Sequence, residues 1–160
     1  AGEIGQLKIH VGEKYGRGES DVSLESLVGF AGIARQIEFA ARKHGDETLR
    51  QLSPTKVDLK RLGDLAKQGN PAAQEVIKDT ADYLGQGIAT LVNICNPSIV
   101  IIIGPICEFG ELLFDPIWER VRADCLPDFV NDLDIVPTSL EDGVVLGAVS
   151  LLLRRELSLL

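Results

Sequence analysis

The strongest pattern in the chain is the stretch Ile99-Val100-Ile101-Ile102-Ile103-Gly104-Pro105. Five β-branched residues in a row favour a β-strand, and the lack of polar alternation is typical of a strand that is covered on both faces. Gly104-Pro105 ends the run, because proline has no backbone N–H with which to continue a ladder. We therefore predict a strand over residues 99–103.

The segment before this strand has the period of an amphipathic helix. Asn70-Pro71 is a start signal, with asparagine as the N-cap and proline at the first helical position, and Pro97 stops the helix. Apolar residues recur at intervals of three and four, namely Ile77, Ala81, Leu84, Ile88, Leu91 and Cys95. Gly85 and Gly87 cost roughly 1 kcal/mol each relative to alanine, which suggests close packing against another backbone, although a tolerated loss of stability is the alternative. One long helix is predicted over residues 71–94.

Helix and strand alternate again after residue 104. A helix is predicted from Leu112, Leu113, Ile117, Trp118 and Val121. It is expected to bend or restart at Asp115-Pro116. Residues 133–137 predict a second short strand, and residues 144–157 predict a last helix. The candidates for the buried side of that helix are Leu146, Val149, Leu152 and Leu153.

This order predicts an α/β layer with two parallel strands joined by a right-handed crossover. In such layers ligands collect beyond the carboxyl ends of the strands, which here is the segment 104–110, although an ordinary strand-to-helix turn explains the same residues. A two-stranded layer is thin, so neighbouring sequence or a second chain is expected to complete the sheet.

Residues 1–69 have a different sequence pattern from residues 70–160. Residues 7–11 alternate polar and apolar side chains as a half-buried strand does, and residues 12–20 form a polar, glycine-bearing loop. Asp21 or Ser23 is the expected N-cap of a helix that runs to residue 28.

A second helix is predicted over residues 32–44, with Gly29 and Gly32 marking the bend before it. A turn at Ser53-Pro54 then leads to a short helix over residues 57–67. We predict two parts of one structural domain that belongs to a longer protein. Residues 1–69 are a loop-strand segment with a helical insertion, and residues 70–160 are an α/β lobe.

Composition and charge exclude several classes of function. The chain is 45% hydrophobic and carries a net charge of -8, so it can bury a core and has no dense basic track for DNA. Its three cysteines, Cys95, Cys107 and Cys125, are widely spaced, which favours buried thiols in a reducing cytoplasm over a disulfide framework. The longest apolar run, residues 99–103, is far shorter than the roughly 20 residues that span a bilayer, so no membrane partner is expected.

The first five residues, Ala1-Gly2-Glu3-Ile4-Gly5, place a glutamate between two glycines. Glycine lets the backbone approach a ligand closely, so Glu3 is a candidate hydroxyl-binding carboxylate. The alternative is an ordinary turn before a strand.

Several stretches, taken together, resemble the C-terminal part of ROK proteins. They are the opening five residues, then Ser23-Leu24-Glu25, then the segment from Leu91 to Gly104, and finally Gly143-Val144-Val145-Leu146-Gly147-Ala148. The order and spacing match across nearly all of the chain. ROK proteins comprise bacterial sugar kinases and sugar-responsive transcriptional repressors. The resemblance implies the second lobe of an actin-like, ribonuclease-H-like ATPase fold, with a helical insertion.

The resemblance also implies a sugar site. The two glutamates that accept hydrogen bonds from sugar hydroxyls in the family resemble Glu3 and Glu25 of this chain. The family histidine that ligates zinc and contacts sugar is replaced by Gln6, whose amide can still hydrogen-bond a sugar.

The zinc site of the family is predicted to be lost. Its three cysteine positions are occupied by Gly16, Gly18 and Ser23, and its histidine position by Gln6, so no thiolate or imidazole ligand remains. His10 alone cannot replace them. We therefore predict no metal and no cofactor in this chain.

The catalytic groups of the family kinases, an aspartate base and an Asp-x-Gly-x-Thr phosphate loop, would lie upstream of Ala1. The Gly-Gly pair that meets nucleotide in the kinases is Gly104-Pro105 here, so Gly104 is expected to be a degenerate nucleotide contact. The DNA-reading winged helix of the repressors would also lie outside this chain. No catalytic residue is therefore assigned to it.

These features favour a C-terminal effector-binding and oligomerisation domain of a cytoplasmic, sugar-responsive transcriptional regulator. Its expected partners are a sugar or sugar phosphate and further copies of the same protein, with DNA bound only through another segment. The first alternative is the C-terminal fragment of a ROK sugar kinase that phosphorylates a hexose or an amino sugar with ATP. The second alternative is a structural dimerisation domain.

Overall fold

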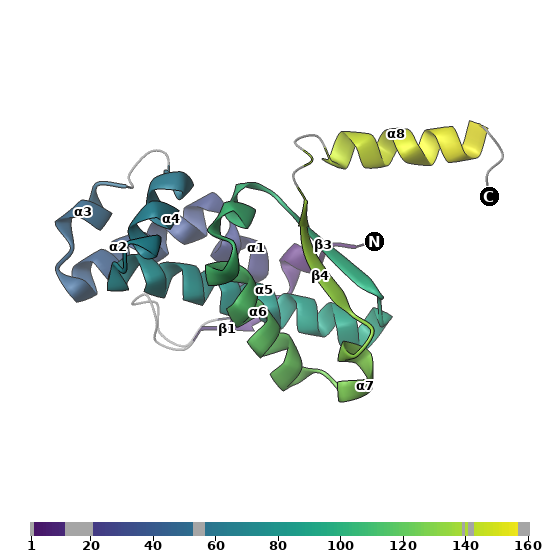
Figure 1. Ribbon diagram of the computed structural model, residues 1–160, viewed down its shortest axis with the longest axis horizontal. Coiled ribbons are helices and arrows are strands. Elements are labelled where there is room, and N and C mark those ends of the chain that lie inside the picture. Colours follow the sequence, from purple (N-terminus) through teal and green to yellow (C-terminus); the bar gives the residue numbers. More distant parts are fainter. Residues whose placement is uncertain (1, 12–20, 53–56, 139, 141–142, 157–160) are drawn as a thin grey trace.

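Helix α5 (Pro71–Cys95) forms the centre of the fold (Figure 1). It begins as predicted, with the Asn70 side chain accepting a hydrogen bond from the backbone N–H of Ala73 at 2.9 Å and Pro71 at the first helical position. It ends at Asn96, whose φ of 44° is a left-handed conformation that asparagine tolerates better than most residues. The computed structural model describes residues 2–11, 21–52, 57–138, 140 and 143–156.

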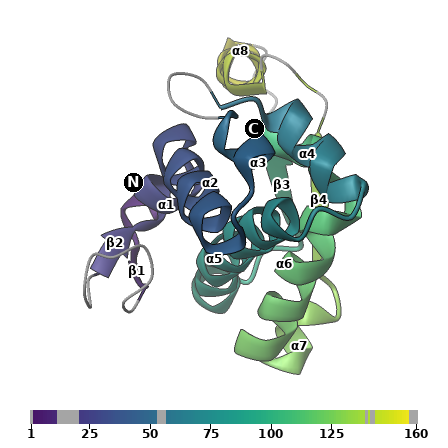
Figure 2. The same ribbon diagram turned by 90° about the vertical axis from the view of Figure 1, so that its left-hand side faces the viewer.

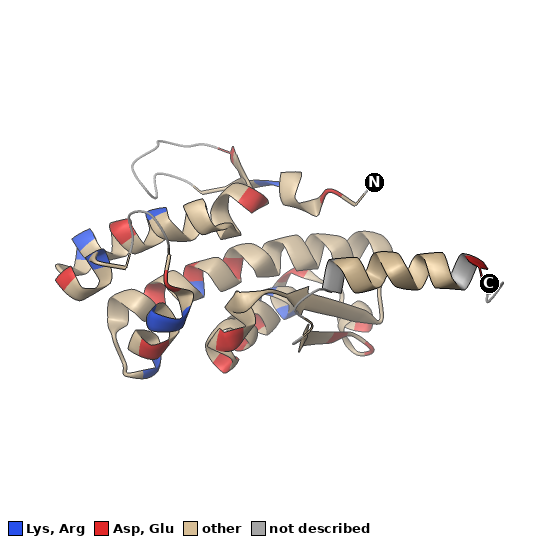
Figure 3. Cartoon of the chain, turned by 90° about the horizontal axis from the view of Figure 1, so that it is seen from above, with Lys and Arg blue, Asp and Glu red and all other residues tan. Residues whose placement is uncertain are grey.

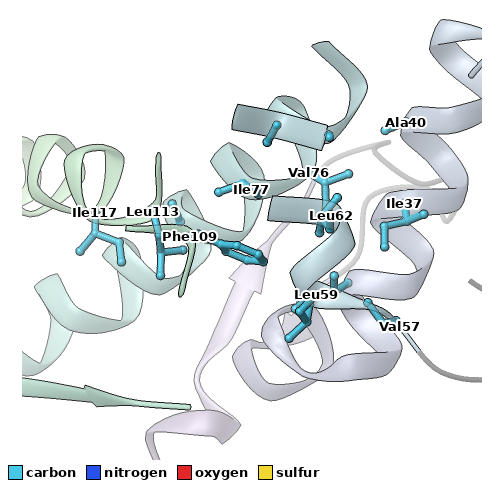
Figure 4. Packing of buried hydrophobic residues seen from close by; sticks show 14 of the residues in the cluster. Ile37, Ala40, Val57, Leu59, Leu62, Val76, Ile77, Phe109, Leu113 and Ile117 are labelled. Carbon is cyan, nitrogen blue, oxygen red and sulfur yellow. The ribbon is translucent and has the colours of Figure 1, made fainter. Parts of the chain in front are cut away.

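Helices that precede α5 in the sequence and a helix that follows it pack against α5. Those before it are α1 (Leu24–Val28), α2 (Phe30–His44) and α4 (Leu59–Lys67), and the one after it is α6 (Glu111–Asp124). The apolar faces predicted for α2, α4 and α6 point into one core, joined by the 3-10 turn η3 (Pro105–Phe109), as Figure 4 shows. The core residues labelled there include Ile37, Leu62, Val76, Ile77, Phe109, Leu113 and Ile117.

Two glycines in α5 allow this packing. A Cβ at Gly85 would lie 2.7 Å from the Cβ of Arg120 on α6, and a Cβ at Gly87 would lie 2.5 Å from a methyl carbon of Leu24 on α1. Both glycines are closely packed, but the nearest contacts are side chains rather than the backbone that was predicted; only Gly85 also approaches a backbone atom, the Ile117 carbonyl oxygen at 3.3 Å. The lower helix propensity of glycine is tolerated where these neighbours approach α5.

A tight corner joins α1 to α2. Gly29 lies between the two helices, and a Cβ at Gly32 would lie only 2.0 Å from the carbonyl oxygen of Leu27. The buried Gln36 side chain donates to that same oxygen at 2.9 Å and accepts from the Thr80 hydroxyl of α5 at 3.2 Å. The bend is as predicted, although α2 begins at Phe30 rather than at Gly32.

The two C-terminal strands, β3 (Ile99–Ile103) and β4 (Asp134–Thr138), are parallel, as predicted, with Ile101 opposite Val136. The prediction that β3 is covered on both faces is wrong for this chain. Its even-numbered residues pack toward the core, whereas Ile99, Ile101 and Ile103 are 47–54% exposed. The reason is that, in the described chain, the two-stranded sheet has a helical layer on one face only.

Helix α8 (Gly143–Glu156) extends away from the body of the molecule (Figures 1 and 2). Its predicted buried residues, Leu146, Val149, Leu152 and Leu153, are all exposed, so that prediction is wrong for this chain. The amphipathic pattern is present, but no other described element covers the apolar side. Leu157, the predicted last residue, lies outside the described residues.

Further differences concern short elements. The sequence did not indicate β2 (Asp21–Ser23), α3 (Glu47–Arg50) or α7 (Pro127–Val130). The predicted first strand is β1 (Lys8–His10), which pairs antiparallel with β2. The loop over residues 12–20 and the turn at Ser53-Pro54 lie outside the described residues.

Helix α6 continues through Pro116 without the predicted restart. Of the cysteines, Cys125 is buried and Cys107 half-buried, but Cys95 is exposed, contrary to its place in the α5 pattern. Among the described residues, no helix combines the length and apolarity that crossing a bilayer requires.

Candidate functional site

The glycine-framed turn at residues 2–6 lies next to the start of α1. We call this region, which carries Glu3, Gln6 and Glu25, the carboxylate corner. The turn folds as the 3-10 helix η1 (Ile4–Gln6), and the Gln6 side-chain amide donates a hydrogen bond to a carboxylate oxygen of Glu25 at 3.2 Å. Both side chains are exposed. Glu3 is the N-cap residue of η1 and is also exposed. The structure thus joins Gln6 to Glu25 directly and places Glu3 at the start of the same turn.

Gly5 allows this approach. A Cβ at Gly5 would lie 3.2 Å from the Cβ of Glu25 and 3.6 Å from its carboxylate oxygen. The 3.2 Å contact is tighter than nine in ten real Cβ contacts, so with a larger residue at position 5 the Glu25 side chain would have to shift by a few tenths of an ångström. The second glycine of the motif therefore has a packing role against Glu25.

A small apolar cluster fixes the corner to the rest of the fold. Ile9 of β1, Leu24 and Leu27 of α1, and Tyr83 of α5 are buried together. The backbone N–H of Leu24 also donates to the carbonyl of Leu7 at 2.8 Å, which extends the β1–β2 pairing to the start of α1. The first turn of α1, where Glu25 lies, is consequently tied both to β1 and to α5.

The corner offers hydrogen-bonding groups rather than a metal site. Within the described ranges, no three His, Cys, Asp or Glu side chains gather as a metal site would require. Gln6 donates to Glu25, and the Ser23 hydroxyl pairs with the Ser26 hydroxyl at 2.7 Å. Gly16 and Gly18 lie outside the described residues. These donors do not fit zinc, which is bound in proteins chiefly by thiolates, imidazoles and carboxylates.

A groove opens at the carboxyl end of β3, close to Gly104. One part has a volume of about 160 Å³ and an adjoining part about 550 Å³. Phe30, Leu59 and Pro105 line both parts. Gly104 has a φ of 128°, which a residue with a side chain rarely adopts. The groove therefore combines an apolar lining with a glycine turn.

Helix α1 connects the groove to the carboxylate corner. Glu25 lies in its first turn, and Val28 and Gly29 at its other end line the groove. At 1.5 Å rise per residue, four residues separate the two positions by about 6 Å along the helix axis. The carboxylate corner and the groove therefore lie at the two ends of one short helix.

Two residues of this region were missed from the sequence. Phe30 is 60% exposed in the groove, and nothing in its spacing distinguished it from a core aromatic residue. Gln36 is buried on the apolar side of α2, between Ile33 and Ile37. A lone amide within an apolar helix face was the available signal for Gln36.

The ionisable groups with shifted pKa values lie away from the corner. Burial raises the pKa of Glu75, but hydrogen bonds from Lys43 and His44 at 2.7–2.9 Å lower it by more, so the net shift is downward. Burial raises the pKa of the Cys107 and Cys125 thiols, which keeps both protonated at neutral pH. In the cartoon of Figure 3, acidic and basic positions both occur along the helices around α5.

The fold is that of a class of α/β proteins to which sugar kinases and sugar-responsive regulators belong. The chain belongs to the ROK family, whose model matches residues 1–155. The predicted family is thereby confirmed.

Two named relatives represent the two activities in this family. The chain is 36% identical over 135 residues to a glucokinase of Thermotoga maritima, covering 82% of this chain and 43% of the relative. It is 28% identical over 158 residues to the DNA-binding transcriptional dual regulator NagC of Escherichia coli, covering 98% of this chain and 38% of the relative. The chain thus spans less than half the length of these relatives.

Solved structures share the fold. A putative sugar kinase from Cytophaga hutchinsonii superposes with a TM-score of 0.74 at 19% identity, covering 94% of this chain and 48% of that one. A ROK family transcriptional regulator, a homologue of the Escherichia coli MLC protein, gives 0.68 at 26% identity, covering 84% and 33%. The mixed α/β ROK fold is therefore common to kinases and regulators, and the fold alone does not separate the two.

Proposed function

We propose that the chain is the sugar-binding part of a ROK sugar kinase, which transfers a phosphoryl group from ATP to a hexose or an amino sugar. This reverses the order that the sequence favoured, in which a regulator came first. The higher identity to the glucokinase than to NagC supports the change. The observation that carries the proposal is that α1 bears Glu25 in its first turn and ends, at Val28 and Gly29, on the lining of the groove. Phosphoryl transfer requires a sugar site beside a nucleotide site, because the accepting hydroxyl and the nucleotide must meet in line.

The residues of the corner have separate roles in this proposal. Glu3 and Glu25 accept hydrogen bonds from sugar hydroxyls, and Gln6 contacts the sugar through its amide. The groove takes the nucleotide, with Phe30 and Leu59 against the base and the Gly104 turn close to its backbone. The general base and the phosphate loop come from a segment outside these 160 residues.

Release of ADP by the full-length protein tests the proposal. With D-glucose or N-acetyl-D-glucosamine as the acceptor, ADP is expected to form only when sugar is present. Glu25→Gln is expected to raise KM for the sugar at least tenfold, because an amide replaces the accepting carboxylate. Glu119→Gln, an exposed acid on α6, is the matched control. Absence of sugar-dependent ADP release with a panel of hexoses and amino sugars would reject the kinase.

A sugar-responsive regulator is the second candidate. The observations that favour it are Gln6 at the position of the family histidine and Pro105 at the position of the second nucleotide-binding glycine. A regulator binds sugar without consuming ATP, and its affinity for DNA changes with the sugar. In either case we propose a cytoplasmic protein that assembles with further copies of itself.

A further inference from the structure

The described residues of the carboxylate corner do not suit the zinc ion that the resemblance to the family implies there. At the zinc-ligand positions that the structure describes, Gln6 and Ser23 are both engaged in hydrogen bonds with protein groups. Neither side chain supplies the thiolate or imidazole that zinc prefers. Some other interaction must therefore fix the segment that carries Glu25.

Backbone pairing supplies that interaction. β1 and β2 form an antiparallel ladder with Lys8 opposite Ser23 and His10 opposite Asp21. The Leu24-to-Leu7 hydrogen bond carries the pairing on to α1, and the buried Ile9 anchors the ribbon beneath it. In this way the ladder fixes the position of the α1 backbone, but it does not fix the rotamer of the exposed Glu25 side chain.

Resting on the proposed function, we propose that Gln6 is the positioning residue for Glu25, in place of a metal-bound histidine. Its amide nitrogen lies 3.2 Å from one carboxylate oxygen of Glu25, and Gly5 permits the approach. The carboxylate can also accept from a sugar hydroxyl, and the amide oxygen of Gln6 can accept from a neighbouring hydroxyl.

The chemistry of an amide suits this role. A primary amide neither gains nor loses a proton over the ordinary pH range, and it is a poor zinc ligand. The hydrogen bond to Glu25 is therefore independent of both metal and the titration of Gln6. The ligand that fits the corner is a neutral polyol with adjacent hydroxyl groups, as in a hexose.

The test measures sugar binding and metal content of the full-length protein. Binding of D-glucose and N-acetyl-D-glucosamine is followed by isothermal titration calorimetry for the wild type, Gln6→Met, Gln6→His and the control Gln68→Met, which changes an exposed glutamine at the end of α4. Gln6→Met keeps the side-chain length and removes the donor, so Kd is expected to rise about tenfold with the thermal midpoint unchanged. Gln6→His retains an N–H donor and is expected to restore most of the affinity without zinc.

Each outcome decides a separate point. Unchanged Kd for Gln6→Met, in a protein that binds sugar, overturns the role of Gln6 and leaves the proposed function intact. Stoichiometric zinc whose removal by a chelator lowers the thermal midpoint overturns the metal-free corner. Failure of the wild type to bind any hexose or amino sugar overturns the proposed function together with this inference.

Discussion

Apolar side chains are buried among the helices around α5, whereas many of them are exposed on the β3–β4 sheet and on α8. In the helical part, Ile37, Leu113 and Ile117 are fully buried among side chains from several elements. In the other part, Ile101 is 54% exposed and Leu151 of α8 is 69% exposed. The contrast teaches that the helical part completes its own core, whereas the sheet and α8 offer apolar surface for contacts outside the described chain.

The largest expected effect comes from the core of the helical part. Leu113→Ala removes a fully buried side chain and is expected to cost about 3 kcal/mol, because transfer and cavity terms add. Leu126→Ala, at a position that is 61% exposed, is the control and is expected to cost less than about 0.5 kcal/mol. Urea unfolding of both variants measures the difference, and equal costs would contradict the assignment of the core.

A second comparison uses glycines. Gly32→Ala is expected to cost about 2 kcal/mol, because its Cβ would lie 2.0 Å from the Leu27 carbonyl oxygen and the backbone would have to move. Gly147→Ala in α8 has no atom within 4 Å of its Cβ and is expected to stabilise the protein by up to about 1 kcal/mol. Thermal unfolding of the two variants should therefore give shifts of opposite sign.

The exposed face of β3 gives the third prediction. If the rest of the full-length protein covers this face, Ile101→Lys should lower its stability by about 1.5 kcal/mol, since a charge would be buried there. Ile94→Lys, at a position on α5 that is 76% exposed, is the matched control and should have little effect. If the two variants unfold at the same denaturant midpoint, the exposed face of β3 is not covered in the full-length protein.

The fourth prediction concerns the ion pairs that join α2 to α5. The folded-state pKa of Glu75 is lowered, so its contribution is present above the unfolded pKa of about 4.3 and is lost as the pH falls through the folded pKa. Glu75→Gln is expected to cost about 1 kcal/mol at pH 7, because the carboxylate is paired but partly solvated.

Unfolding of the wild type and Glu75→Gln across a pH series checks this point. The two stability curves should converge at acid pH, below the folded pKa of Glu75. A difference that persists there would show that Glu75 acts through packing and not through its charge.

The smallest effect is expected at the β1–β2 ribbon. His10 and Asp21 lie 3.3 Å apart, but both side chains are more than 60% exposed. His10→Ala is therefore expected to change stability by less than about 0.5 kcal/mol at pH 6, measured by thermal unfolding. A loss of several kcal/mol would mean that this ion pair, rather than the ladder and Ile9, holds the ribbon.

Much of the helical part could be predicted from the sequence, because its signals are local. Asn70-Pro71 marks the start of α5, and the spacing of Leu59, Leu62 and Ala66 gives the buried face of α4. The burial of β3 and α8 could not be predicted in the same way. An apolar run shows that a face suits burial, but the partner that covers it is a property of the assembly.

The same distinction between local sequence signals and tertiary features applies to the candidate site. Glu3, Gln6, Glu25 and Gly104 were singled out by their resemblance to family motifs, and the structure brings Gln6 and Glu25 into contact. The first strand was predicted, but its pairing with β2 was missed, because β2 has only three residues and the paired positions are 11–15 apart. The carboxyl end of β3 was predicted as a place for ligands, and the groove lies there; the contribution of Phe30 and Leu59 was missed, because these residues meet Pro105 only through the tertiary fold.

Hydrogen exchange of the full-length protein with and without saturating D-glucose tests whether the carboxylate corner binds sugar. Amide exchange is expected to slow in peptides that cover residues 2–11 and 21–29, where the sugar would be bound and the corner ordered. The amide exchange rates of peptides within residues 145–153 should not change when sugar alone is added. Sugar-dependent protection that leaves residues 2–11 and 21–29 unaffected would contradict the assignment of Glu3, Gln6 and Glu25 to the sugar site.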